Sequence, residues 1–167
     1  MPADRMIRQL QTKSDLINCV RLLRRSFGTV AVEFALTKAT APTNPAFVTK
    51  AKLKEYLRKP VALYGLLENE LLIGCVAIEK SKHNNSTFYI ERLAVAPEAR
   101  HHGYGDELLR YAFERIRDAG GATASIGLMD NNDRLKGWYQ TKGFVQTACK
   151  TIEHLPFKVC YMSKDLA

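Results

Sequence analysis

Residues 98–109, EARHHGYGDELL, combine two glycines with the start of an amphipathic helical pattern. Gly103 and Gly105 flank Tyr104 directly before that pattern. The first turn of a helix presents main-chain N–H groups that lack a partner, together with the positive end of the helix dipole. Glycine has no side chain, so the main chain can approach a phosphate closely there. These residues therefore predict a pyrophosphate site at 100–106.

Two familiar phosphate-binding loops do not match this stretch. A Walker A loop needs Gly-Lys-Ser/Thr, whereas Asp106 follows Gly105. The dinucleotide fingerprint G-x-G-x-x-G needs a third glycine where Leu108 stands, and it belongs to an early strand–helix–strand unit. This loop lies past the middle of the chain, so neither nucleotide-binding fold is supported.

The spacing Arg100-x-x-Gly103-x-Gly105, after the stretch RLAVAPEA, matches a different loop. It resembles the acetyl-CoA loop of the GNAT family of N-acetyltransferases, which reads Arg/Gln-x-x-Gly-x-Gly/Ala after a strand. Acetyl-CoA is a multiply charged anion, and the formal net charge of +8 favours a partner of that kind.

A second signature of the family lies downstream. Asn132 is followed seven residues later by Tyr139, and then by Gly143-Phe144. The resemblance covers about residues 70–150 well, and in the first 60 residues it concerns topology only.

The resemblance implies which residues meet acetyl-CoA. The strand backbone of Leu93, Ala94 and Val95 would pair with the pantetheine arm, and Asn132 and Tyr139 would line the same site. The pyrophosphate would be held by the main-chain amides of a continuous loop: Arg100, His101, His102, Gly103, Tyr104, Gly105 and Asp106. Strands 87–95 and 122–129 would splay apart to admit the thioester.

Acyl transfer to an amine needs a neutral amine, a stabilised oxyanion and a proton for the departing thiolate. The resemblance implies direct attack within a ternary complex, with main-chain N–H groups around 93–95 facing the oxyanion. It implies Tyr139 as the general acid, and a phenol of pKa about 10 suits a departing thiol. The alternative is that Tyr139 only packs on the cofactor.

Glu91 is the candidate general base, acting directly or through water. On a regular strand Glu91 shares a face with Tyr89, Leu93 and Val95. The alternative is an ion pair with a surface base. Arg92 is a poor partner on this interpretation, because neighbouring residues on a strand point in opposite directions.

Other reactive side chains receive weaker interpretations. His101 and His102 are adjacent, which is poor geometry for joint metal binding, and phosphate contact or exposure is expected instead. His154 lies in a turn before Pro156, either near the acceptor or as a plain turn residue. The four cysteines form no CxxC pair, so we expect reduced thiols, no metal site and no acyl-cysteine intermediate.

The elements that must position these residues can be read from hydrophobic periodicity. We expect strands at 5–11, 61–80 (a hairpin), 87–95, 122–129, 144–152 and 157–164, and helices at 13–27 (capped by Ser14), 48–59, 103–119 and 130–144. They form one mixed α/β domain over 1–167, with a mostly antiparallel twisted sheet, splayed fourth and fifth strands and flanking helices. The cofactor-binding core is expected at about 87–145, and the segment at about 1–60 is expected to shape the acceptor site.

The expected activity is that of an acetyl-CoA-dependent N-acetyltransferase acting on a primary amine of a small molecule or peptide. The longest apolar run, 71–78, is too short to span a bilayer, so no membrane contact and a cytoplasmic location are expected. A homodimer through the strand at 157–164 is left open. Two alternatives are a CoA-binding sensor or scaffold without catalysis and, less supported by the scattered basic residues, a nucleic-acid-binding domain.

Overall fold

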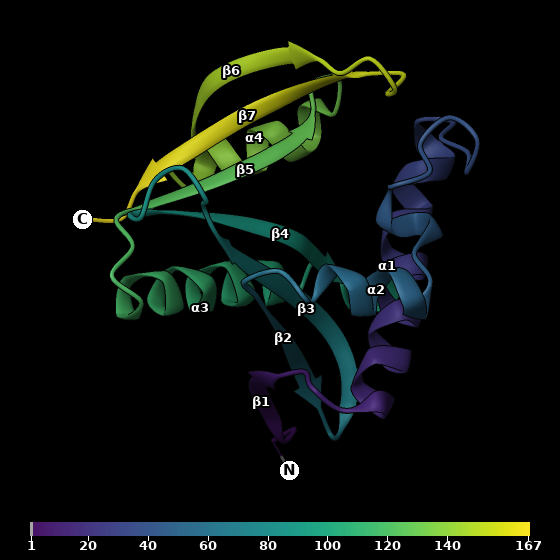
Figure 1. Cartoon of the computed structure of the whole chain (residues 1–167). Helices are drawn as coiled ribbons and strands as arrows, with labels where there is room; N and C mark the ends of the chain where they lie inside the picture. Colours follow the sequence, from purple (N-terminus) through teal and green to yellow (C-terminus); the bar gives the residue numbers. More distant parts are fainter. Residues whose placement is uncertain (1) are drawn as a thin grey trace.

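The computed structural model of the chain describes residues 2–167. A single mixed sheet of seven strands has the order β1-β2-β3-β4-β5-β7-β6, and helices cover both of its faces (Figure 1). The strands are β1 Arg5–Gln9, β2 Val61–Glu68, β3 Leu71–Lys80, β4 Thr87–Val95, β5 Thr123–Met129, β6 Val145–Thr151 and β7 Lys158–Asp165. The α-helices are α1 Lys13–Glu33, α2 Lys50–Tyr56, α3 Tyr104–Asp118 and α4 Asp133–Thr141. The predicted order of elements is confirmed.

The strands β4 and β5 form the one parallel pair of this sheet, and they stay paired only briefly. Thr87, Phe88 and Tyr89 pair with residues 123–125, after which the two strands continue without pairing with each other. Figure 1 shows β4 and β5 diverging from their paired ends. The predicted splay is therefore confirmed, and the edge of β4 beyond Tyr89 is open.

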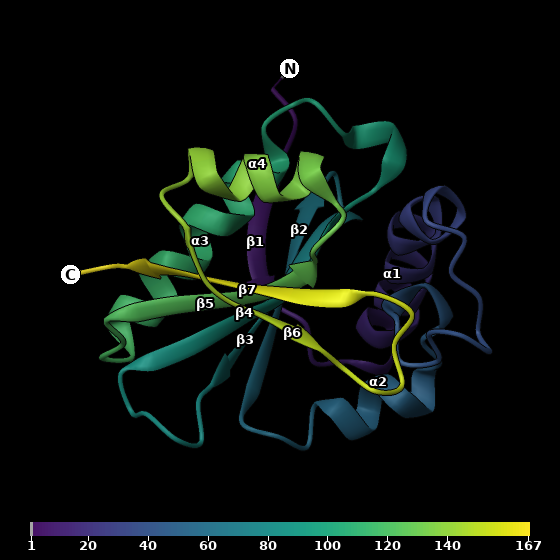
Figure 2. The same cartoon turned by 90° about the horizontal axis from the view of Figure 1, so that it is seen from above.

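The two faces of the sheet carry separate hydrophobic cores. One core joins α3 and α4 to the sheet and includes Ile78, Ile90, Leu108 and Tyr139. The other core joins α1 and α2 to the opposite face. Figure 2 shows α3 and α4 on one side of the strands and α1 and α2 on the other. Leu108 is fully buried, and a leucine buried in this way stabilises the fold by about 1.5–3 kcal/mol.

The first helix, α1, has a different N-cap and a different last residue from those predicted. Thr12, not Ser14, caps α1, because its hydroxyl accepts the N–H of Asp15 at 3.1 Å and the Asp15 carboxylate accepts the N–H of Thr12 at 3.1 Å. This reciprocal capping box places Ser14 inside the first turn. The helix also continues past the predicted end at 27 to Glu33.

The β2–β3 hairpin has the predicted tight turn. Asn69 and Glu70 both have positive φ, 49° and 67°, as a two-residue turn that matches strand twist requires.

The last strand, β7, lies inside the sheet and not at one of its edges. β7 pairs with β5 on one side and with β6 on the other, so it has no free edge. The strands β6 and β1 form the edges of the sheet, so β7 has no edge free to pair with a second copy, and a homodimer stays an open expectation.

A third, smaller core ties the N-terminal segment to the far half of the sheet. Ala41 and Ala46, in and next to the loop after α1, pack with Phe47. Met129 at the end of β5 and Phe157 before β7 join the same cluster. The segment before β2 thus reaches the end of β5 where the sheet is open.

Candidate active site

The glycine loop connects the open end of β4 to α3. Gly103 has φ of 83° and forms the N-cap of α3, and His101 has φ of 66°. Within the described part of the chain, the first main-chain N–H of α3 to meet a carbonyl is that of Glu107, which bonds Gly103 O at 3.0 Å. The amides of Tyr104, Gly105 and Asp106 are thereby left for a ligand. This is the arrangement that pyrophosphate binding requires.

The side chain of Arg100 is committed to the protein rather than directed to a ligand. Its guanidinium donates to the Ser26 carbonyl at 2.9 Å, to the Ser26 hydroxyl at 3.3 Å and to the Thr29 hydroxyl at 3.0 Å. Because Ser26 and Thr29 belong to α1, Arg100 anchors the loop to that helix. The main-chain N–H of Arg100 also donates to Pro97 O at 3.4 Å, so the contact of Arg100 with the cofactor stays a prediction.

Other side chains of the loop also point elsewhere. Tyr104 donates its hydroxyl to Glu68 at 2.8 Å. His102 turns back, with Nδ1 2.7 Å from the carbonyl of Arg100, whereas His101 is exposed. The loop therefore offers main chain rather than side chains.

Asp106 is held by two cations at the start of α3. Lys142 Nζ lies 2.7 Å from its carboxylate and Arg110 lies 3.0 Å away. Lys142 first, and then Arg110, keeps the pKa of Asp106 below its usual range. The Lys142 contact also draws the end of α4 onto the glycine loop.

The helix α4 brings its aromatic residues beside the loop. A Cβ added to Gly105 would lie 3.6 Å from Trp138 Cζ2 and 3.9 Å from Val95 Cγ2, so these three residues meet. Asn132 caps α4, accepting the N–H of Leu135 at 3.2 Å. This capping role is not one that the sequence resemblance implied.

Tyr139 is 7% exposed and lies in the core next to this wall. Its ring meets Trp138 and Phe144 edge-on, with centroids 5.0 and 5.3 Å apart. Burial raises the pKa of Tyr139 above that of a free phenol. The hydroxyl therefore stays protonated at neutral pH.

The strand β4 contains a β-bulge beside the open edge. Ala77 pairs with Glu91 and Cys75 with Ala94, so the bulged strand has one extra residue, and Arg92 has φ of 51°. The extra residue reverses the alternation of side chains beyond it. Glu91, which precedes it, keeps the face of Tyr89, toward α1 and α2.

This bulge corrects two expectations from the sequence. Leu93 and Val95 pack against the core on the α3 face, so Glu91 does not share their face, although it shares that of Tyr89. Arg92 Nη1 lies 3.7 Å from Glu91 Oε2, so Arg92 is a partner of Glu91 after all. An assumption of regular alternation cannot reveal either fact.

The main chain beyond the bulge presents donors to the open edge. The N–H of Ala96 donates to the carbonyl oxygen of Ile73, a residue of β3, at 2.8 Å. Because strand amides alternate in direction, the N–H groups of Leu93 and Val95 point away from β3, toward the gap left by β5. Ala94 faces the other core, where it is buried.

Glu91 occupies a partly desolvated position. Its side chain is 32% exposed. Burial raises the pKa of Glu91 to about 7, and the neighbouring Glu79 carboxyl adds to the shift, whereas Arg92 opposes it. A carboxyl with this pKa can accept a proton near neutral pH.

The remaining reactive residues lie outside this arrangement. His154 is exposed in the turn before β7. Cys149 is exposed and the other three thiols are buried, and all four are free. Within residues 2–167 no group of three or more His, Cys, Asp and Glu side chains is placed to hold a metal ion. In the same range, no helix combines the length and apolar character needed to cross a membrane.

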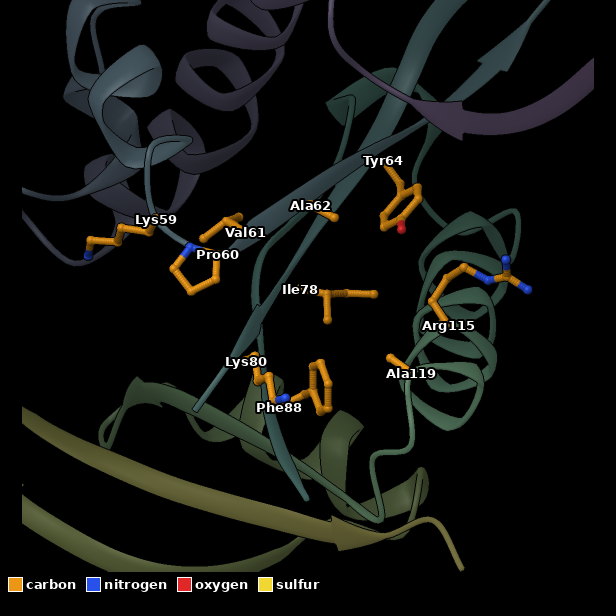
Figure 3. A pocket seen from close by; sticks show the side chains of 10 residues that line it. All are labelled: Lys59, Pro60, Val61, Ala62, Tyr64, Ile78, Lys80, Phe88, Arg115 and Ala119. Carbon is orange, nitrogen blue, oxygen red and sulfur yellow. The ribbon is translucent and has the colours of Figure 1, made fainter. Parts of the chain in front are cut away.

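A hollow of about 310 Å³ lies apart from these residues, between β2, β3 and the end of α3 (Figure 3). Lys59, Tyr64, Phe88 and Arg115 line it, and it contains no residue of the glycine loop. This hollow is distinct from the candidate site.

Comparison with known proteins agrees with this geometry. The model of the "Acetyltransferase (GNAT) family" matches residues 32–144. An amino-acid acetyltransferase of Pseudomonas aeruginosa (strain PAO1) is 30% identical over 122 residues, which are 72% of this chain and 26% of that protein. A counterpart from Pseudomonas putida is 28% identical over the same length and the same shares of both chains. The chain thus spans about a quarter of the length of these relatives.

Solved structures share the fold at low identity. The ribosomal-protein-S18-alanine N-acetyltransferase from Escherichia coli has a TM-score of 0.76 at 14% identity, covering 98% of this chain and 95% of that one. The paia N-acetyltransferase from Thermoplasma acidophilum, in complex with coenzyme A, has a TM-score of 0.72 at 17% identity, covering 97% and 99%. The predicted architecture is confirmed at the level of the fold.

Proposed function

The chain belongs to the GNAT acetyltransferase family, and we propose that it transfers the acetyl group of acetyl-CoA to a primary amine. One observation carries this proposal above the others. The open edge of β4, with the N–H groups of Leu93 and Val95, leads directly into a glycine loop whose amides at 104–106 are free. An extended ligand with a pyrophosphate at one end matches that succession of donors.

The residues present suit acetyl-CoA as the acetyl donor. The pantetheine amides would pair with Leu93 and Val95, and the pyrophosphate would meet the start of α3, where the helix dipole favours negative charge. Gly103 and Gly105 carry no side chain to obstruct it. The net charge of +8 supports binding of a polyanion.

The side chains support a direct transfer. Glu91, with its raised pKa, would take a proton from the incoming amine, directly or through water. The N–H groups near Leu93 and Val95 would stabilise the oxyanion that forms when the amine attacks the thioester carbon. Tyr139 would give its proton to the departing thiolate, and because burial raises its pKa and weakens it as an acid, this transfer depends on placement of the hydroxyl at the sulfur.

The acceptor class and location belong to the same proposal. The names of the relatives state amino acids and an alanine of a ribosomal protein as acceptors, which supports a small-molecule or peptide amine here. A cytoplasmic location is supported by four free cysteines, which persist in a reducing compartment.

Calorimetric titration with acetyl-CoA tests the cofactor assignment. Gly105→Glu places a carboxylate beside Trp138 and Val95, where the cofactor is expected, and should abolish the binding heat. Gly137→Glu, another helical glycine with open space around it, is the matched control and should bind normally. Gly103 is a poorer test, because its positive φ strains any replacement.

The outcomes separate the competing functions. Equal binding by both variants would discard the loop assignment. Binding by the wild type without acetyl transfer to any amine would indicate a CoA-binding sensor instead. Binding of nucleic acid in place of acetyl-CoA would support the nucleic-acid alternative.

A further inference from the structure

A cluster of polar side chains lies on the α2 face of the sheet, outside the glycine loop; we call it the α2-face cluster. It consists of Tyr56, Glu79, Glu91 and Arg92. Glu79 pairs with Tyr89, and Ala77 pairs with Glu91. Glu79 and Glu91 therefore project from the same face, diagonally across neighbouring strands, where long side chains can meet.

Tyr56, the last residue of α2, carries a buried hydroxyl that faces the Glu91 carboxyl without forming a well-aligned hydrogen bond to it. The residue is 7% exposed, and over the described range its buried oxygen has no hydrogen-bond partner. Leaving a buried polar group unpaired costs about 1–3 kcal/mol, so such a group signals a missing ligand or water. Burial first, and then Glu91, raises the pKa of Tyr56, so the hydroxyl can donate as well as accept.

Arg92 holds this cluster together. Its guanidinium carbon lies 3.6 Å from the centroid of the Tyr56 ring, and its Nη1 lies 3.7 Å from Glu91. Arg92 Nε is also buried without a partner in the described chain. With one guanidinium between two carboxyls, the cluster retains one net negative charge when both carboxyls are ionised.

The cluster opens onto the gap in the sheet. Pairing between β4 and β5 ends at Tyr89, two residues before Glu91. The side chains of Leu93 and Val95, by contrast, pack on the α3 face. A donor lying along the β4 edge could therefore be approached from the α2 face by a second molecule.

We propose that Glu79 and Tyr56 complete an acceptor subsite around Glu91, and that it takes a cationic primary amine with no carboxylate beside its amino group. This rests on the proposed acetyltransferase function. The two carboxyls attract an ammonium group and repel a neighbouring carboxylate, while the Arg92 guanidinium stacks on the Tyr56 ring and turns Nη1 toward Glu91. The Tyr56 hydroxyl supplies a hydrogen-bond partner for the bound amine.

The proton balance of the transfer suits a pair of carboxyls. The ammonium gives one proton to the ionised pair and becomes a neutral amine. Its nitrogen then forms a bond to the acetyl carbon, and the carbon–sulfur bond breaks. Tyr139 gives its proton to the departing thiolate, and the second proton lost by the nitrogen returns to Tyr139 through water. The proton held by the pair returns to water.

The groups facing Glu91 determine the pH range in which its carboxylate can accept a proton. They are Glu79 from β3, Arg92 from β4 and Tyr56 from α2, with Lys59 5.8 Å from the centroid of the Tyr56 ring. The Glu79 carboxyl raises the pKa of Glu91 and Arg92 lowers it. Removing the charge of Glu79 should therefore shift the pKa of Glu91 downward.

The acceptor class is tested with matched pairs of single amines that differ in one carboxylate: tyramine against tyrosine, and phenethylamine against phenylalanine. We expect kcat/KM to be about tenfold or more higher for the decarboxylated member of each pair, as the loss of one charged contact would predict. A preference for the amino acids would overturn the proposal. If acetyl-CoA binds and none of these amines is acetylated, the proposed function itself fails, and this inference fails with it.

Two variants then test the residues with the best amine of this panel. Tyr56→Phe should lower kcat/KM by about tenfold while Tm stays the same or rises, because the lost hydroxyl has no partner in the protein. Glu79→Gln should lower kcat/KM similarly and move the acid limb of the pH–rate profile to lower pH. Both should bind acetyl-CoA as the wild type does.

The controls are Glu55→Gln, exposed on α2, and Tyr64→Phe, on the opposite face of the sheet, and both should leave transfer unchanged. Unchanged kcat/KM in Tyr56→Phe or Glu79→Gln would remove that residue from the subsite. If a variant loses activity and its Tm also falls, the substituted residue has a structural role only. The same conclusion holds for Glu79 if the acid limb of the pH–rate profile does not move in Glu79→Gln.

Discussion

Burial shifts the pKa of Tyr139 and that of Glu91 in the same direction, with different consequences for each residue. A buried phenol holds its proton more firmly, so Tyr139 is a weaker acid toward a departing thiolate than a free phenol. A buried carboxyl holds its proton into the neutral range, which makes it a stronger base once ionised. Desolvation thus favours the proton-accepting role of Glu91 and opposes the proton-donating role of Tyr139.

For Tyr139 the prediction concerns turnover. Tyr139→Phe should lower kcat by about a hundredfold or more, the usual contribution of a positioned general acid, and leave acetyl-CoA affinity unchanged. Steady-state kinetics and calorimetry measure the two effects separately. Weakened acetyl-CoA binding with unchanged kcat would instead show that Tyr139 packs on the cofactor.

For Glu91 the prediction concerns stability against pH. The folded pKa of about 7 lies above the ordinary value of 4.5, so the folded chain retains a proton that the unfolded chain loses between these values. Stability associated with this group is complete below about pH 4.5 and is lost as pH rises through about 7. Glu91→Gln should therefore gain stability over the wild type as pH rises.

Thermal unfolding at pH 5 and pH 8 measures the effect of Glu91. We expect the difference in Tm between variant and wild type to grow by a few degrees, since 1 kcal/mol moves Tm by about 2–4 °C in a domain of this size. Exposed Glu55→Gln serves as the control and should show no such growth. Parallel Tm curves for Glu91→Gln and the wild type would contradict the desolvation of Glu91.

At the scale of elements, α1 begins at a network of charged and polar contacts. Arg8 donates two hydrogen bonds of 2.9 Å to the Asp15 carboxylate, which also accepts the N–H groups of Gln11 and Thr12. The hydrogen bonds from Arg8 keep the pKa of Asp15 well below its usual range. The network joins β1 to the helix that later anchors Arg100.

Asp15→Ala should destabilise the protein by about 2–4 kcal/mol, because it removes a cap and leaves a guanidinium unpaired. The wild-type contribution of Asp15 is present above its ordinary pKa of 3.8 and is lost as pH falls below it. Urea unfolding at pH 7 measures the loss. Ser14→Ala is the control and should change stability little; equal destabilisation by both would refute the capping box.

The bulge in β4 is the element-scale feature on which the site depends. Glu91, before the bulge, faces α2, and the bulge directs Leu93 and Val95 to the other core. The base and the wall of the cofactor site thereby lie on opposite faces of one strand. Acceptor and donor can then meet at the edge of β4 without sharing a binding surface.

At the scale of the whole molecule, the net charge of +8 affects how fast an anionic ligand associates and does not determine the fold. The association rate of acetyl-CoA should fall by roughly tenfold as ionic strength rises from about 0.05 to about 0.3 M, because salt screens long-range attraction. Stopped-flow binding measures this rate. S-acetylpantetheine, which lacks the phosphates of acetyl-CoA, supplies the control and should show little salt dependence; an unchanged rate for acetyl-CoA would contradict electrostatic steering.

Features that depend on residues close together in the chain can be predicted from the sequence alone. The order of elements follows from hydrophobic periodicity and from glycine and proline positions. The position of the glycine loop before α3 and the spacing of Asn132 and Tyr139 were equally readable, because each signal lies within a short stretch of chain. The mixed sheet and its splayed strands followed from the family that these signals resemble.

Which distant residues meet depends on contacts across the whole fold. Tyr56, Glu79 and Glu91 come from three different elements, and their meeting depends on how β3 pairs with β4 and where α2 packs. The extra residue at Arg92 turns Leu93 and Val95 to the other face. The interior position of β7 likewise depends on long-range pairing with β5 and β6. A bulge and a strand order result from competition among pairings across the whole sheet, so local patterns do not specify them.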